Sequence, residues 1–168
     1  MKRIDKENYY LDIAETVLER STCLRRCYGA IIVNSDEVIA TGYNGAPRGR
    51  KNCADLNRCT RQELNIPSGE RYELCRSVHA EANAIISAAR RDTVGGTLYL
   101  VGRDARTGEL LSDATSCSMC RRLVINSGLE RVVIRRTETE FEIVNVRDWV
   151  WEDDQMAAAV QNAEMDLK

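Results

Sequence analysis

Apolar positions recur along the chain with two different spacings, and each spacing predicts one type of secondary structure. Residues 7–20 carry apolar side chains three and four positions apart, which predicts an amphipathic helix with Asp5 as its N-cap. β-branched runs at 28–33 and 37–42 are separated by three polar residues and predict a β-hairpin. The first part of the chain is therefore expected to form a helix followed by two antiparallel strands.

Helical and strand patterns continue to alternate in the rest of the chain. The expected elements are a helix over 79–91 capped by Ser77, a strand over 97–101, a helix over 117–127 between Ser116 and Gly128, strands over 130–135 and 141–146, and a helical tail over 148–165. About five residues, Arg136–Glu140, join the last two strands, and a parallel crossover needs a dozen or more, so we expect an antiparallel pair. The order α-β-β-α-β-α-β-β-α predicts an α/β fold with a mixed five-stranded sheet and helices on its faces.

The segment from residue 50 to residue 76 interrupts this alternation. It has little periodicity and contains Cys53, Cys59 and Cys75. A loop of this length inside a compact domain is unusual unless something holds it in place or it has a function.

Composition narrows the class of protein. A chain of 168 residues is expected to form one domain, over 1–168, and a net charge of −2 with a pI of about 5.6 argues against binding to long nucleic acid. The apolar runs are too short for a membrane span, and the charged N-terminus lacks an apolar signal segment, so we expect a cytoplasmic protein. Seven cysteines, an odd number, then indicate metal ligands or reduced thiols rather than disulfides.

Two short motifs carry the candidate chemistry. His79, the only histidine of the chain, is followed two positions later by Glu81, and Cys117 and Cys120 form a Cys-x-x-Cys pair entering another helix. One imidazole and two thiolates suit Zn²⁺ and leave the fourth tetrahedral position open to a water. Zinc lowers the pKa of such a water toward neutrality, which generates a hydroxide nucleophile.

Glu81 is placed to move protons rather than to bind the metal. It lies on a different face of the helical turn from His79, so it is a poor fourth ligand. A carboxylate there can exchange protons between the bound water and a C–N centre that loses ammonia. Either motif alone is more often structural than catalytic, but together they favour a catalytic site.

The combination of His79-Ala80-Glu81 with Cys117-Ser118-Met119-Cys120 resembles the zinc-dependent cytidine and deoxycytidylate deaminase superfamily. Further stretches over residues 5–135 are most similar to the deoxycytidylate (dCMP) deaminases: Cys23 before the 28–33 strand, Thr41-Gly42-Tyr43-Asn44-Gly45, and Asn52-Cys53. The resemblance implies a three-layer α/β/α fold. It also implies hydrolysis of dCMP to dUMP and ammonia, by attack of zinc hydroxide at C4 with Glu81 as proton shuttle.

The same resemblance suggests substrate contacts. It implies that Asn44 holds the sugar 3′-hydroxyl, and that Glu81 and the backbone N–H of Ala80 read the cytosine edge. The substrate phosphate needs cationic donors, and we name Arg48 as the candidate. Other candidates are Arg25, Arg26, Arg50 and Lys51.

The resemblance further implies a second, structural zinc that clips the loop 52–76. Cys23 and Cys53 match its ligands directly, and Cys59 and Cys75 fall in the right region with altered spacing. Four thiolates would close a tetrahedral site, whereas the alternative is that these cysteines are apolar fillers or reduced surface thiols. Cys27 has no assigned role.

Two features depart from the family pattern. Ser116 stands where the family usually has proline before the first cysteine of the pair, and we expect the site to survive because serine also caps helices. The short 136–140 link leaves no room for the helix that the family usually carries between its last two strands.

Assembly and regulation follow from the resemblance alone. It implies a homo-oligomer, a hexamer or a dimer, for which Trp149 and Trp151 could anchor contacts, and possible regulation by dCTP or dTTP. Three alternatives stay open: a deaminase of another cytosine nucleotide or nucleoside, a tRNA adenosine deaminase, and a non-catalytic zinc-stabilised nucleotide-binding module. A basic face would favour the second, and the carboxylate of Glu81 argues against the third.

Overall fold

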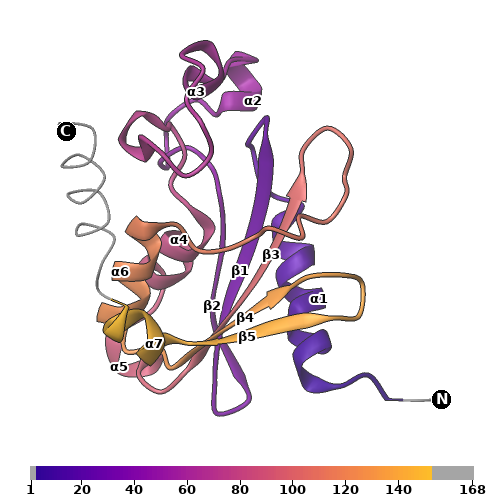
Figure 1. Cartoon of the computed structure of the whole chain (residues 1–168), viewed down its shortest axis with the longest axis vertical. Helices are drawn as coiled ribbons and strands as arrows, with labels where there is room; N and C mark the ends of the chain where they lie inside the picture. The colour runs from indigo at the N-terminus through magenta and orange to yellow at the C-terminus, as the bar shows by residue number, and fades with distance from the viewer. Residues whose placement is uncertain (1–2, 153–168) are drawn as a thin grey trace, which may run out of the picture.

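A five-stranded sheet with strand order β2-β1-β3-β4-β5 organises the computed structural model, which describes residues 3–152 (Figure 1). The elements in chain order are α1 (Lys6–Leu18), β1 (Arg26–Asn34), β2 (Glu37–Tyr43), α2 (Cys53–Leu56), α3 (Thr60–Glu63), a 3₁₀ helix η1 (Tyr72–Leu74), α4 (Ala80–Ile86), α5 (Arg90–Thr93), β3 (Thr97–Asp104), α6 (Ser118–Ser127), β4 (Arg131–Arg135), β5 (Phe141–Asn145) and α7 (Val146–Trp151). The part of the expected helical tail beyond residue 152 lies outside the described residues.

The sheet is mixed, as the pattern predicted. β1 pairs with β2 and with β3 antiparallel, and β3 pairs with β4 parallel. β4 and β5 pair antiparallel, which confirms the expectation from their short connection. The turn between them is tied to the rest of the fold, because the Arg136 guanidinium donates to the carbonyls of Ser112 and Ala114 at 2.8 and 2.6 Å.

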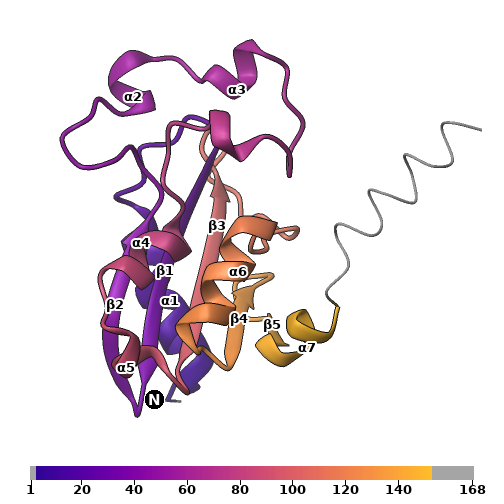
Figure 2. The ribbon, with the colours of Figure 1, turned by 90° about the vertical axis from the view of Figure 1, so that its left-hand side faces the viewer.

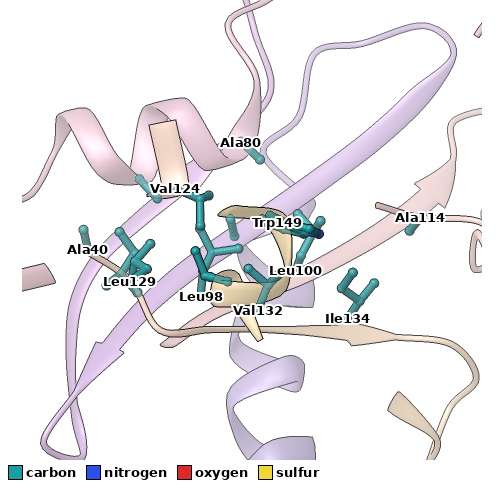
Figure 3. Packing of buried hydrophobic residues seen from close by; sticks show 14 residues of the cluster. Ala40, Ala80, Leu98, Leu100, Ala114, Val124, Leu129, Val132, Ile134 and Trp149 are labelled. Carbon is teal, nitrogen blue, oxygen red and sulfur yellow. The ribbon is translucent and has the colours of Figure 1, made fainter. Parts of the chain in front are cut away.

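The two faces of the sheet bury alternate residues under different helices, which confirms helices on both faces (Figures 1 and 2). Ile31 and Val33 of β1 pack under α1, and the alternate residues Ala30 and Ile32 face the other helices. On that second face, side chains of β3 and β4 lie beside Val124 of α6 and Trp149 of α7 (Figure 3).

Helix boundaries differ from the sequence expectation near the two motifs. The single helix expected over 79–91 is broken into α4 and α5, and Ala89 between them has an extended backbone. The expected caps Ser77 and Ser116 are also wrong. His79 and Cys117 occupy the N-cap positions, with extended backbone.

Other end signals hold. The Asp5 side chain accepts from the Asn8 N–H and caps α1, and α6 ends at Gly128 in the left-handed conformation. In α7, Trp149 is buried in the core, whereas Val150 is 49% exposed. Within residues 3–152, no helix has the length and apolar character needed to cross a bilayer.

Gly42 sets how closely α4 approaches the sheet. A Cβ at this position would lie 2.2 Å from the Ala80 carbonyl oxygen and 2.4 Å from the Ala84 nitrogen. The backbone of α4 therefore rests directly on β2, and this contact positions the helix start that carries His79.

We predict that Gly42→Ala lowers the free energy of unfolding by about 1–3 kcal/mol, because the added methyl group forces α4 away from the sheet. Chemical denaturation of both proteins measures the change. The control is Thr41→Ala on the exposed face of the same strand, which should cost less than about 1 kcal/mol. Equal losses in the two variants would contradict the proposed close contact.

Candidate active site

The starts of α4 and α6 bring the two sequence motifs together. These helices pack side by side on one face of the sheet (Figure 2). His79 Nδ1 lies 3.4 Å from Cys117 Sγ and 3.5 Å from Cys120 Sγ, and the ligand atoms of all three residues lie within 4.8 Å of one another. Residues 38 positions apart thus form one compact group of candidate ligands.

This group fits a zinc ion in chemistry and in spacing. One imidazole nitrogen and two sulfurs are the donors of a His/Cys/Cys zinc site. Nitrogen and sulfur atoms that share a tetrahedral zinc stand about 3.6 Å apart, given the usual bond lengths. The observed N–S separations of 3.4 and 3.5 Å agree with this value.

The three candidate ligands hold their protons unequally, because the pKa of Cys117 is lowered and those of His79 and Cys120 are raised. Hydrogen bonds with Cys120 and His79 lower the pKa of Cys117 to about 4, against the effect of burial. Burial opposes the charged form of His79, but its contacts with the thiols of Cys117 and Cys75 raise the pKa of His79 to about 10. Negative charge therefore concentrates on Cys117, and zinc would displace the proton of His79 when it binds.

Glu81 lies beside the three candidate ligands in an environment that favours its protonated form. Its side chain is 4% exposed, and burial raises the pKa of its carboxyl group. Glu81 lines the same cavity as His79 and Cys117 but does not belong to the group of potential metal ligands. A carboxyl group in this position can hold a proton next to a ligand in the cavity.

Two arginines hold the segment of chain that leads into Cys117. Arg121, one turn into α6, donates from Nε to the Ser116 carbonyl at 3.1 Å, and its guanidinium stacks 5.0 Å from the ring centre of Trp149. Arg136 holds the carbonyls just upstream, as described above. The first turn of α6 is therefore fixed by the C-terminal part of the described chain.

The predicted substrate residues are distributed unequally around the cavity. Asn44 and Ala80 are buried and line it. The Asn44 side chain already accepts from the Tyr28 N–H and the Ser21 hydroxyl and donates to the Arg26 carbonyl, which leaves one amide hydrogen for another partner. Arg48 is exposed and is not among the residues that line the cavity.

Several cavity residues lie in the segment without periodicity and were not selected from the sequence. Arg61 and Tyr72 of the 52–76 loop line the cavity, as does Tyr28 at the start of β1. Neither spacing nor composition distinguishes these residues, because their contacts are long-range. A tyrosine directly before the buried β1 run was the only available signal, and it is weak.

The four cysteines proposed for a second zinc lie around the same cavity. Cys23, Cys53, Cys59 and Cys75 all contribute to its lining. Burial raises the pKa of Cys53, and the thiols of the other three add to the rise. In residues 3–152, however, only the His79, Cys117 and Cys120 group brings three or more ligand atoms within 4.8 Å of one another, so the second zinc stays a prediction.

Comparison with known proteins identifies relatives over most of the chain. The family model of the cytidine and deoxycytidylate deaminase zinc-binding region matches residues 4–136. The deoxycytidylate deaminase of Mycobacterium phage D29 is 37% identical over 137 residues, which are 79% of this chain and 96% of that protein. The deoxycytidylate deaminase of Schizosaccharomyces pombe is 33% identical over 127 residues, 76% of this chain and only 36% of that longer protein.

Solved structures share the fold. The dCMP deaminase of cyanophage S-TIM5 aligns with a TM-score of 0.54 at 25% identity, over 80% of this chain and 85% of that one. A cytidine deaminase of Burkholderia pseudomallei reaches the same TM-score at 17% identity, over 86% and 95% of the two chains, and this likeness concerns the fold alone. The mixed sheet with helices on both faces is thus common to both kinds of protein.

Proposed function

We propose that this chain, which belongs to the cytidine and deoxycytidylate deaminase family, hydrolyses the exocyclic amino group of a cytosine nucleotide, converting dCMP to dUMP and ammonia. The observation that carries the proposal is the buried carboxyl group of Glu81 beside a His/Cys/Cys ligand set in one cavity. A purely structural zinc site has no use for such a carboxyl group. The dCMP specificity is supported by the relatives, which are named deoxycytidylate deaminases.

The proposed mechanism assigns proton transfer to Glu81. When bound at His79, Cys117 and Cys120, zinc would activate water as a nucleophile near neutral pH. Glu81 accepts the proton that this water loses and delivers it to N3 of the cytosine ring. The oxygen of this water would add to C4, and Glu81 would pass its remaining proton to the amino group. The C4–N bond then breaks as the C4=O bond forms, and the amino group leaves as ammonia. A carboxyl group whose pKa is raised by burial suits this alternation between acid and base.

Recognition of the nucleotide is assigned to the cavity walls. The Ala80 N–H, at the first position of α4, and Glu81 are proposed to read the cytosine edge. The remaining amide hydrogen of Asn44 is proposed to donate to the sugar 3′-hydroxyl, while its other bonds hold the amide in place.

An arginine that lines the cavity is better placed than Arg48 to bind the substrate phosphate. Arg25, which the sequence offered as a second choice, lines the cavity, and its buried Nη1 atom has no hydrogen-bond partner in the described part of the chain. A buried guanidinium N–H without a partner is costly, and a phosphate oxygen would satisfy it. We therefore propose Arg25 as the principal phosphate ligand.

A second zinc is proposed to join Cys23, Cys53, Cys59 and Cys75. It would clip the 52–76 loop to the connection between α1 and β1, which is where Cys23 lies. A homo-oligomeric state and regulation by dCTP or dTTP are further proposals that rest on the family alone.

We predict that Glu81→Gln keeps its zinc and loses deamination, because the amide cannot exchange protons. The rate constant kcat for dCMP should fall by at least about 10²–10⁴-fold, while metal analysis of the purified variant stays at the wild-type value. Glu130→Gln, a change of the same type at an exposed position, should retain full activity. Substantial turnover by Glu81→Gln would remove Glu81 from the mechanism.

Zinc content tests the two metal sites separately. Wild-type protein should contain two zinc ions per chain, and Cys120→Ala and Cys53→Ala should each contain one, because each loses a ligand of a different site. Cys27→Ala serves as the control, since Cys27 does not line the cavity, and should keep both ions. One zinc in the wild type would refute the four-cysteine site.

Steady-state assays with dCMP, cytidine, deoxycytidine and dCTP determine the substrate. We expect the highest kcat/KM for dCMP. Arg25→Gln should raise KM for dCMP by about tenfold or more and leave deoxycytidine turnover unchanged, because a hydrogen bond to a charged group is lost. Arg48→Gln is the matched control and should behave as wild type. A preference of the wild type for unphosphorylated nucleoside would overturn the dCMP assignment.

A further inference from the structure

Tyr72 packs directly against the ligand His79. The two ring centres are 4.7 Å apart and the ring planes are perpendicular. Tyr72 begins the 3₁₀ helix η1 at the end of the long loop, and both rings border the cavity. Edge-to-face packing at this distance is an attractive arrangement of two aromatic rings.

Arg61 holds Tyr72 from another direction. Its guanidinium carbon lies 4.4 Å from the centre of the Tyr72 ring. The same group donates to the Pro67 carbonyl and, at 2.7 Å, to the Glu70 carbonyl. One arginine therefore fixes both the aromatic ring and the backbone of the loop that carries it.

The burial of Arg61, in the short helix α3, is unusual for an arginine. Its side chain is 7% exposed, and within residues 3–152 it makes no ion pair. Exposed arginines of this loop pair with carboxylates instead, as Arg58 does with Glu63. The positive charge of Arg61 is thus balanced by two carbonyl dipoles and an aromatic face, a combination that requires the loop to keep this conformation.

We infer that Arg61 and Tyr72 are positioning residues for the zinc ligand His79. The imidazole must present Nδ1 to the sulfurs of Cys117 and Cys120, and rotation about its Cβ–Cγ bond would turn Nδ1 away. The Tyr72 ring restricts this rotation, and Arg61 keeps the ring in place. Groups that orient a metal-binding histidine typically contribute 10–100-fold to metal affinity or activity.

This inference rests on the proposed zinc site but is independent of which nucleotide is the substrate. Zinc affinity is measured without substrate, so the inference can be tested even if the wild-type protein does not deaminate dCMP. If Arg61 and Tyr72 only helped the loop to fold, zinc affinity would not depend on whether residue 72 has an aromatic ring.

The experiment compares zinc affinity in four variants of the full chain: Tyr72→Leu, Arg61→Gln, Tyr72→Phe and Arg58→Gln. Zinc is titrated against a chelator, and the phase that Cys120→Ala abolishes identifies the catalytic site. Tyr72→Leu and Arg61→Gln should bind zinc at this site about tenfold or more weakly and show a lower kcat with a smaller change in KM.

Tyr72→Phe retains the ring and loses only the hydroxyl group, which accepts from the Gly69 N–H. Together with the exposed Arg58→Gln control, it should stay within about twofold of wild type. Wild-type zinc affinity in Tyr72→Leu, or an equal loss in Tyr72→Phe, would overturn the inference.

A double variant tests whether Arg61 acts through Tyr72. If it does, Arg61→Gln should add little to the loss already caused by Tyr72→Leu. If the fold-changes in zinc affinity of the two single variants simply multiply, the two residues act independently. The inference that Arg61 acts on His79 through Tyr72 is then refuted. Both single variants could weaken zinc binding by loosening the whole loop. Even then, the loss of zinc affinity in the double variant stays close to that of one single variant only if the two residues act as one unit. The Tyr72→Phe result then decides whether the aromatic ring itself is required.

Discussion

The close approach of two helix starts is the constraint on which the site depends. His79 and Cys117 occupy the N-cap positions of α4 and α6, and Cys120 lies in the first turn of α6. These helices start side by side because α4 rests on the bare backbone of Gly42 and α6 packs against the neighbouring strands. A bulkier residue under α4 would separate the imidazole from the thiols without changing any ligand. The geometry of the candidate ligands is therefore a property of helix–sheet packing as much as of the side chains themselves.

The regular part of the fold could be predicted from the sequence because its signals are local. β-branched runs in β1 and β2, helical spacing in α1 and the short 136–140 link led to the correct sheet elements and the antiparallel last pair. The helix boundaries beside the motifs could not be predicted in this way. Serine precedes each motif and is the better intrinsic cap, but the ligand residues take the cap positions, and tertiary placement overrides the local preference.

The candidate site shows the same division. The His79, Glu81 and Cys-x-x-Cys spacing indicated a metal and a proton carrier, because those residues lie at fixed offsets within single helices. The loop that covers them has no such period. Arg61 of α3 contacts the Tyr72 ring eleven positions further along the chain, and no periodic pattern indicates this contact. The choice of Arg48 for the phosphate had the same weakness, since proximity to the Tyr-Asn-Gly segment in sequence does not place a side chain in the cavity.

The turn that carries Arg136 limits where peptide can be inserted into this chain. Exposed hairpin turns usually accept inserted peptides, tags or fused domains with little effect on the rest of a protein. Here the guanidinium of Arg136 reaches the carbonyls of Ser112 and Ala114, three to five residues before the first thiol ligand. Lengthening this turn would move that guanidinium and release the chain leading into α6. In the exposed turn after β3, the Ala105 N–H donates to the Arg25 carbonyl, but Arg106 and Thr107 form hydrogen bonds only within the turn. Residues 106–107 are therefore a better place for an insertion.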